Sequence, residues 1–252
     1  MKLLTLARDL KRRKAREKHT LFVAEGVRAV EELSRSRLTI RGALVAPQLR
    51  DAPRGEQLEA SLRSRSVAIE DVSALEFASA AETESPQGVM AIAEIPVLGF
   101  EAITDDWKGA ILVLDAVQDP GNVGTILRTA AALGVIATIA MPGTVDLWNA
   151  KVVRSGMGAH FKHLMFPGTW SELDSFQKHS GCEILAADAS GVDVASFTPG
   201  PRAALVVGNE GSGLSVDARS RAARTISLPL KPDVESLNVA VATGILLYAL
   251  AR

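Results

Sequence analysis

The sequence predicts an α/β protein with a smaller N-terminal domain and a larger C-terminal domain built on a mostly parallel sheet. Two observations carry this prediction. The 252 residues are 47% hydrophobic, which is enough for two ordinary domains that each bury a core. Short apolar runs alternate with segments of helical periodicity over residues 97–252, as they do in parallel sheets covered by helices.

The N-terminal domain is expected over residues 1–96. Its predicted elements are a basic amphipathic helix over 2–18, a strand and helix over 20–33, a strand over 38–46, short helices around 56–64 and 71–78, and a strand over 86–95. Leu3, Leu6 and Leu10 would share one side of the first helix because their spacing fits the helical repeat. The stretch 96–109 mixes loop and polar signals and is expected to join the domains.

The C-terminal domain is expected over residues 97–252. Its predicted strands are 110–114, 135–140, 183–187, 203–207 and 225–229. Its predicted helices are 121–133, 147–155, 170–178, 214–222 and 236–250. Ligands in such sheets bind beyond the carboxyl ends of the strands, and three loops with unusual residues leave strands there.

Composition narrows the class of protein. The sequence has no run of about 18 apolar residues, the length needed to span a membrane. Its N-terminus lacks the pattern of a secretory signal. The single cysteine, Cys182, excludes an internal disulfide and fits a reducing compartment, so a cytoplasmic location is expected. The four histidines show no spacing typical of a zinc site, so we expect neither a bound metal nor a membrane partner.

Positive charge is concentrated near the N-terminus. Residues 1–50 hold 13 Lys/Arg and 5 Asp/Glu, a net charge of +8, so the rest of the chain carries −9. The run 11–18 suits a phosphate backbone because six of its residues are basic and one is acidic. The candidate contacts are Lys11, Arg12, Arg13, Lys14 and Arg16. A solvated helix face is an equally simple explanation of the run.

The first unusual loop lies within 114–134 and contains a Pro-Gly turn between a strand and a helix. Its glycines, Gly121 and Gly124, match neither the dinucleotide fingerprint nor the P-loop, which counts against a dehydrogenase or an NTPase. A Pro-Gly turn between a strand and a helix does not itself require the side chains of Asn122 or Arg128, so these two residues need another explanation.

The second and third loops also follow predicted strands. Residues 208–213 include three glycines, which allow a ligand to approach the backbone closely. The third loop leads to a helix that Ser236 is expected to cap, with Asn238 in its first turn. That helix is apolar nearly all round, which favours a subunit interface. Taken singly, each loop could be no more than a turn or a cap.

Together the three loops resemble the SpoU/TrmH family of RNA ribose 2′-O-methyltransferases, part of the SPOUT class. The matching residues are, in order, 119–124 with Arg128 and Thr129, then 208–211 with Gly213, then 228–230 with 235–239. The segment 148–161 is similar to the family's middle segment, and Glu25-Gly26 with 86–94 is similar to its small RNA-binding domain. The stretch 231–233 departs from the third motif, which puts the loop shape in doubt.

The resemblance implies a C-terminal domain with a deep trefoil knot and an N-terminal α/β/α substrate-binding domain similar to ribosomal proteins. It implies S-adenosyl-L-methionine as the cofactor, held by the backbone of Gly208, Leu228 and Leu237, and a homodimer that shares its sites. The catalytic residues that it implies are Arg128, Asn122, Glu210, Ser236 and Asn238. The resemblance implies two roles for Arg128, holding a phosphate next to the reacting ribose or acting as the general base. The first is favoured because a guanidinium resists the deprotonation that a general base requires.

The expected function is methyl transfer from S-adenosyl-L-methionine to a ribose 2′-hydroxyl of structured RNA, either rRNA or tRNA. The alternative is a catalytically silent RNA-binding protein on the same fold. The basic run and the family resemblance disfavour methylation of a small molecule or a protein.

Overall fold

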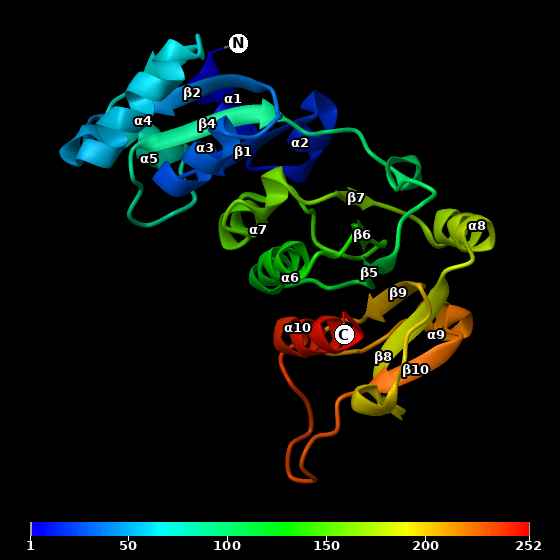
Figure 1. Cartoon of the computed structure of the whole chain (residues 1–252). Coiled ribbons are helices and arrows are strands. Elements are labelled where there is room, and N and C mark those ends of the chain that lie inside the picture. Colours follow the sequence, from blue (N-terminus) through cyan, green and yellow to red (C-terminus); the bar gives the residue numbers. More distant parts are fainter. Residues whose placement is uncertain (1, 252) are drawn as a thin grey trace. The chain divides into compact units, whose positions relative to one another are not determined.

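A computed structural model describes residues 2–251 of the chain (Figure 1). The chain divides into two compact units: Met1–Pro96 with Trp148–Lys162, and Val97–Leu147 with His163–Arg252. The first unit therefore includes a segment from the C-terminal part of the sequence. Among the described residues, no helix has both the length and the apolar character needed to cross a membrane.

The first unit is built on a four-stranded sheet in the order β1–β4–β2–β3. Its strands are β1 (Leu21–Glu25), β2 (Ile40–Val45), β3 (Ile69–Asp71) and β4 (Val89–Glu94). Its helices are α1 (Leu3–Asp9), α2 (Arg13–His19), α3 (Val27–Ser34), α4 (Pro53–Ser64), α5 (Ala74–Ala80) and α7 (Ala150–Ser155), with 3₁₀ turns η1 (Pro47–Asp51) and η3 (Ala159–Phe161). β4 pairs antiparallel with β1 and β2, and the fully buried Phe77, Met90 and Ile92 belong to the core.

The single helix expected over 2–18 is wrong, because α1 and α2 are separate. The side chain of Arg16 turns back and its Nη1 donates to the carbonyls of Leu10 and Lys11, at 2.7 and 2.9 Å. A continuous helix would give these two carbonyls to its own backbone N–H groups. The leucine spacing indicated a helical repeat, but it could not reveal that an arginine takes over the carbonyls at the break.

The segment Trp148–Lys162 is held to the first unit by aromatic contacts. The ring of Trp148 lies 4.5 Å from that of Phe22 in β1, and the ring of Phe161 lies 6.1 Å from it, centroid to centroid. Phe22 is fully buried, so the segment closes one side of the core of this unit.

The second unit contains the parallel sheet that the sequence predicts. Its strands are β5 (Gly109–Leu114), β6 (Thr138–Ala140), β7 (Met165–Pro167), β8 (Glu183–Asp193), β9 (Arg202–Val207) and β10 (Arg224–Ser227). Its helices are α6 (Pro120–Ala132), α8 (Trp170–Ser180), α9 (Val216–Arg221) and α10 (Val239–Leu250), with turns η2 (Phe100–Ala102) and η4 (Val194–Ser196). The strand order is β10–β8–β9–β5–β6–β7, and every adjacent pair is parallel.

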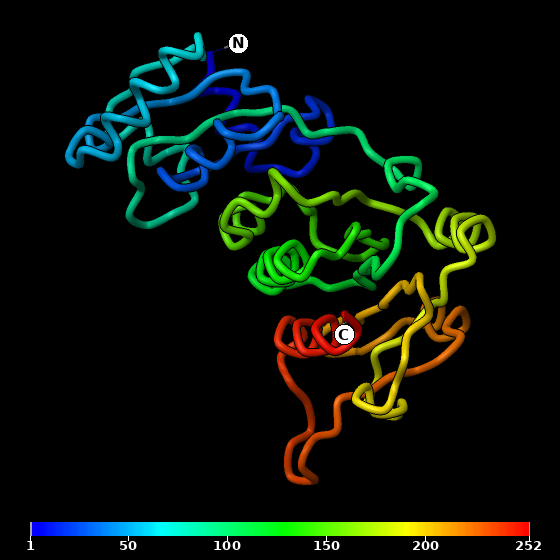
Figure 2. The backbone as a smooth tube through the Cα atoms, in the orientation of Figure 1, coloured from blue at the N-terminus to red at the C-terminus, as the bar shows by residue number. Residues whose placement is uncertain are grey.

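The strand order determines where a ligand would bind. The chain runs outward from β5 through β6 to β7, then returns to the other side of β5 with β8 and β9. Parallel sheets bind ligands where the order reverses, beyond the carboxyl ends of the strands. The loops that follow β5 and β9 both leave the sheet at this place. The loop from β10 to α10 extends away from the sheet (Figure 2).

Candidate active site

A cleft of about 1040 Å³ opens at the carboxyl ends of β9 and β10, beside the second half of β8. Residues of all three predicted loops line it, so the structure brings together segments that are about a hundred residues apart in the chain. Its walls combine apolar side chains, glycine backbone and polar side chains, as a cofactor with both apolar and polar parts requires.

Three polar side chains, one from each loop, form a continuous hydrogen-bonded chain. Nδ2 of Asn122 donates to Oε1 of Glu210 at 3.0 Å, and Oδ1 of Asn122 accepts from Nδ2 of Asn238 at 2.9 Å. Asn122 lies in the first turn of α6, and its own N–H donates to the capping carboxylate of Asp119 at 2.8 Å. The cap therefore orients the central member of the chain.

Glu210 connects the second loop to the first. Its carboxylate accepts from the backbone N–H groups of Gln118 and Asp119, at 3.2 and 3.1 Å, as well as from Asn122. Burial alone would raise the pKa of Glu210, but the hydrogen bonds from Asn122 and the backbone together lower it below its ordinary value. Glu210 is therefore charged at neutral pH and acts as a hydrogen-bond acceptor.

The glycine loop has little room for side chains. A Cβ added to Gly208 would lie 2.4 Å from the carbonyl carbon of Gly213, so only glycine fits there. Asn209 and Gly213 exchange two backbone hydrogen bonds, at 2.9 and 3.0 Å. The side chain of Asn209 accepts from the N–H groups of Gly211 and Ser212 and donates to the carbonyl of Ala116. Asn209 thus determines the shape of the loop and ties it to the first.

Asp115 is a further tie between loops that the sequence did not single out. It directly follows the apolar strand β5, its side chain is buried, and its Oδ2 accepts from the N–H of Ser215 at 2.6 Å. The sequence did contain a signal for this residue, because a carboxylate directly after an apolar strand is unusual.

The third loop corrects the predicted helix cap. Asn238, and not Ser236, is the N-cap of α10, because its Oδ1 accepts from the N–H groups of Ala240 and Val241 at 2.9 and 3.3 Å. Ser236 lies two residues before the cap, in the exposed wall of the cleft. Either residue type can cap a helix, so the spacing alone could not decide between them.

The structure places the predicted cofactor residues Gly208, Leu228 and Leu237 in the wall of the cleft. An apolar surface beside glycine backbone fits a cofactor that has a thioether-like chain and an adenine, because it offers apolar contact and backbone hydrogen bonds together. Among residues 2–251, no group of three or more potential metal ligands is present.

Arg128 is the predicted catalytic residue that does not lie in this cleft. It is exposed on α6, and the residues lining the cleft do not include it. Asn122 lies six residues earlier in the same helix. At 3.6 residues per turn, six residues correspond to about 1.7 turns, so the two side chains point roughly 120° apart around the helix.

The five predicted RNA contacts have different environments. The prediction that Arg16 contacts RNA is wrong, because its guanidinium is buried, donates to backbone carbonyls and cannot reach a phosphate. Nζ of Lys11 donates to two carbonyls at the end of α5. Arg12 and Arg13 are exposed and pair with neighbouring carboxylates, whereas Lys14 is simply exposed.

Comparison with known proteins identifies both parts of the chain. Residues 109–248 match the SpoU rRNA Methylase family, and residues 5–91 match the MRM3-like substrate binding domain. The chain is 34% identical to the Bacillus subtilis 23S rRNA (guanosine(2553)-2′-O)-methyltransferase RlmP, covering 96% of this chain and 93% of that one.

Solved structures of similar proteins match the chain over nearly its whole length. The AdoMet-bound rRNA methyltransferase of Sinorhizobium meliloti is 28% identical with a TM-score of 0.86, covering 98% of this chain and 93% of that one. The SpoU methyltransferase AviRb of Streptomyces viridochromogenes, in complex with AdoMet, is 25% identical with a TM-score of 0.88, covering 100% and 97%. The matched segments contain every residue of the cleft described above, and the chain belongs to the SpoU rRNA methylase family.

Proposed function

We propose that this protein transfers the methyl group of S-adenosyl-L-methionine to a ribose 2′-hydroxyl of 23S ribosomal RNA. The observation that carries the proposal is the hydrogen-bonded chain Glu210–Asn122–Asn238, which joins the three motif loops beside the cleft. Relatives that match nearly the whole chain are named as 2′-O-methyltransferases of 23S rRNA. An rRNA substrate also agrees with the cytoplasmic location expected from the sequence.

The cofactor, when bound, supplies an electrophilic methyl group, and the residues of the chain prepare the ribose. The amide of Asn122 uses one N–H for Glu210 and one carbonyl lone pair for Asn238. It therefore keeps one N–H and one lone pair for a ribose hydroxyl. Held from both sides, Asn122 can orient that hydroxyl without losing side-chain freedom when the substrate binds.

The homodimer belongs to the same proposal. Val241, Ile245 and Tyr248 of α10 are exposed and spaced so that they share one side of the helix. The same helix packs on α6, where a Cβ on Gly244 would lie 3.3 Å from Cγ2 of Thr129, next to Arg128. A partner subunit that covers this apolar stripe would bring Arg128 of one chain toward the cleft of the other, where it binds a phosphate.

The direct test is methyl transfer from labelled S-adenosyl-L-methionine to unmodified 23S rRNA transcripts. The parent should label the RNA, and Asn122→Ala and Arg128→Ala should label it at least tenfold more slowly while keeping the fold. Cofactor binding by calorimetry without any labelling of rRNA or tRNA would favour the silent RNA-binding protein. Labelling of tRNA alone would exclude the proposed substrate.

Mixing the two inactive variants tests whether Arg128 acts across the interface. A mixed dimer would contain one site with both residues intact only if Arg128 comes from the partner. An equal mixture that exchanges subunits should then recover roughly a quarter of the parental rate. If the mixture stays inactive although mixed dimers form, Arg128 serves its own chain.

A further inference from the structure

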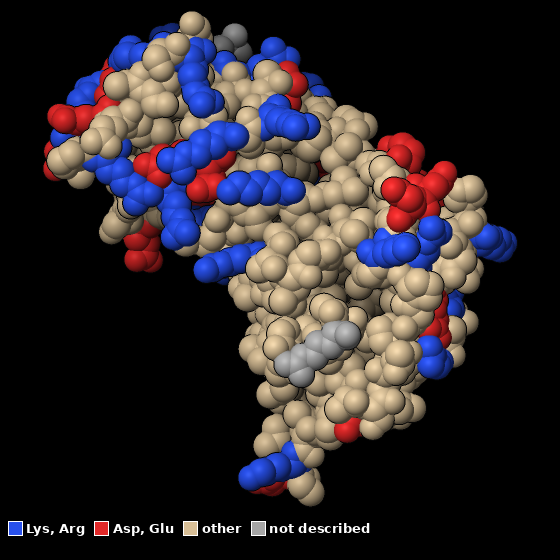
Figure 3. Space-filling model, viewed as in Figure 1, with Lys and Arg blue, Asp and Glu red and all other residues tan. Residues whose placement is uncertain are grey.

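Charge is unevenly divided between the two units. Met1–Pro96 with Trp148–Lys162 contains 19 Lys/Arg and 14 Asp/Glu, a net charge of +5, so the second unit carries −6. The segment Trp148–Lys162 has three basic residues and no acidic one. Figure 3 shows basic side chains surrounding a small acidic cluster on one face of the first unit.

Around α3, basic side chains are fixed by carboxylates. Nε and Nη2 of Arg54 donate to the two oxygens of Glu31, at 2.8 and 2.5 Å. Nζ of Lys162 donates to Glu32 at 2.7 Å, and Nη1 of Arg35 lies 3.5 Å from the other oxygen of Glu32. Three cations therefore share two carboxylates.

The carboxylates lie beneath and the cations lie outside. The side chains of Glu31 and Glu32 are 16% and 21% exposed, whereas those of Arg54, Arg35 and Lys162 are 61% to 66% exposed. This arrangement holds the cationic groups at the surface with unused N–H groups toward solvent. It lowers the entropy that they would lose on binding an anion.

Arg28 adds a fourth cation. It is exposed in the first turn of α3, and no ion pair of this residue occurs among residues 2–251. It lies three and four residues before Glu31 and Glu32 in the same helix, so it shares their side of α3 and is close to the same cluster. Four cations over two carboxylates leave a surplus of two positive charges.

Lys162 comes from the methyltransferase part of the sequence. The segment that carries it packs on α3 at Gly158, whose φ is +91° and where a Cβ would lie 2.9 Å from Cγ of Glu32. A side chain at this position would push the segment away from α3. Gly158 thus allows the segment between β6 and β7 to add a cation to the substrate-binding unit.

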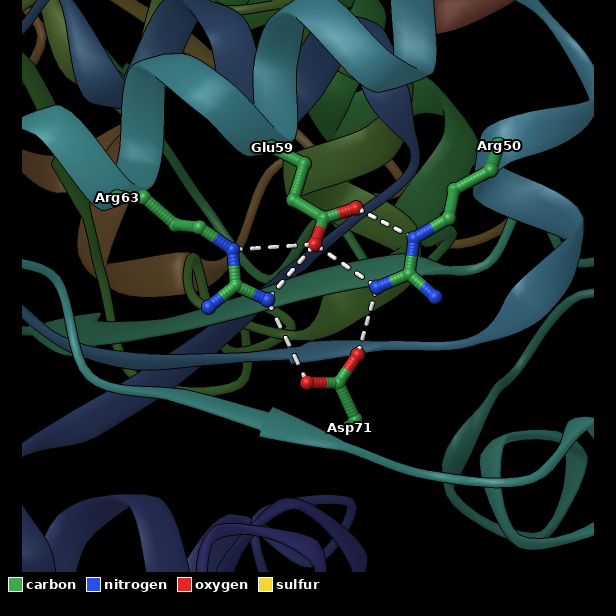
Figure 4. A network of polar contacts seen from close by, with 4 residues as sticks. All are labelled: Arg50, Glu59, Arg63 and Asp71. Carbon is green, nitrogen blue, oxygen red and sulfur yellow. Dashed lines mark hydrogen bonds and ion pairs between the residues drawn. The ribbon is translucent and has the colours of Figure 1, made fainter.

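A second network in the same unit shows what a purely structural cluster looks like (Figure 4). Arg50 and Arg63 both donate to Glu59 and both contact Asp71, so two cations meet two carboxylates. The hydrogen bonds from Arg50 and Arg63 outweigh burial and lower the pKa of Glu59 to about 2. The charges cancel, and the network ties η1, α4 and β3 together without a surplus for a ligand.

We propose that Arg28, Arg35, Arg54 and Lys162 form a phosphate-binding surface on the first unit that docks the backbone of the RNA substrate. The inference rests on the proposed function, which makes RNA the substrate. Guanidinium groups with free N–H donors bind phosphate oxygens with directional hydrogen bonds. Such contacts supply affinity and orientation and carry no base sequence.

The test compares two full-length variants that each remove two positive charges. Arg28→Gln/Lys162→Gln changes the proposed surface and leaves Glu32 paired with Arg35. Lys108→Gln/Lys178→Gln is the matched control, because both lysines are exposed on the second unit and neither lines the cleft or belongs to a candidate RNA contact. Circular dichroism confirms folding, and calorimetry measures the binding of S-adenosyl-L-methionine to each protein.

Binding of a 23S rRNA transcript is measured between about 0.05 and 0.2 M salt, where phosphate contacts dominate the salt dependence. The surface variant should bind about tenfold more weakly and lose ~2 from the salt slope, one for each lost contact. The control should stay within about twofold of the parent. Equal losses in both variants, or none in the surface variant, would overturn the inference.

The same measurements separate this inference from the proposed function. A parent that methylates rRNA beside a surface variant with unchanged RNA binding leaves the function standing and removes the surface. A parent that binds rRNA without methylating it, with the loss confined to the surface variant, supports the surface and removes the function. A parent that does not bind rRNA removes both.

Discussion

At the scale of single residues, the cleft is shaped by groups that have only one acceptable identity. Asn122 must donate on one side and accept on the other, since Glu210 is an acceptor and Asn238 presents an N–H. An aspartate there could not donate to Glu210, and its charge would oppose a second carboxylate nearby. The motif residues are therefore specified by hydrogen-bond polarity as much as by size.

Gly208→Ala should damage the cleft without removing any functional side chain. The added methyl group would overlap the backbone of Gly213, so the loop must move and overpacking should cost roughly 1–3 kcal/mol of unfolding free energy. We expect cofactor affinity, measured by calorimetry, to fall at least tenfold. Gly200→Ala is the control, since no atom would lie within 4 Å of its Cβ. Parental affinity in Gly208→Ala would show that the loop tolerates the shift.

Glu210→Gln should slow methyl transfer at pH 7, because an amide cannot accept from Asn122 and from two backbone N–H groups with both of its polar atoms. The pKa of Glu210 is lowered in the folded protein, so its charge stabilises the fold above its ordinary pKa of 4.5 and loses this effect as pH falls through the lowered value. Urea unfolding of parent and variant should therefore differ at pH 7 and converge in acid. An equal difference at pH 7 and pH 3 would contradict this role.

At the scale of elements, the pattern of apolar residues predicts which segments form strands and helices, but it does not predict where these elements begin and end. The runs that predict β5, β9 and α10 are long, and the structure confirms them. β3 and β7 contain only three residues each, which is too short for a periodic pattern to predict them. The loops of the cleft could be recognised from their motifs, but their hydrogen bonds cross some ninety residues or more of sequence, and no local pattern reports them.

Asn238 allows capping and catalysis to be separated. Asn238→Ala should cost about 1 kcal/mol of unfolding free energy through the lost cap and should also slow methyl transfer. Asn238→Asp keeps an oxygen for the N–H groups of Ala240 and Val241 but cannot donate to Asn122. We expect it to restore most of the stability and little of the activity. Full activity in Asn238→Asp would reduce Asn238 to a cap.

At the scale of the whole molecule, the proposed dimer depends on the apolar side of α10. Ile245→Glu places a charge in the middle of the exposed stripe, and burying it against a partner would be costly. We expect sedimentation to show monomers and methyl transfer to fall with dissociation. Leu75→Glu, at an exposed apolar residue of the first unit, should leave both unchanged. Monomers in the parent itself would remove the dimer from the proposal.

The segment Trp148–Lys162 has a consequence for how such a protein can evolve. Because it leaves the second unit and re-enters it, the polypeptide passes between the units three times rather than once. A gene segment encoding residues 1–96 could not simply be exchanged for another module, since the replacement would have to offer its own packing surface to Trp148 and Phe161. An exchange of the N-terminal domain would therefore have to preserve the aromatic contacts that Phe22 makes with this segment.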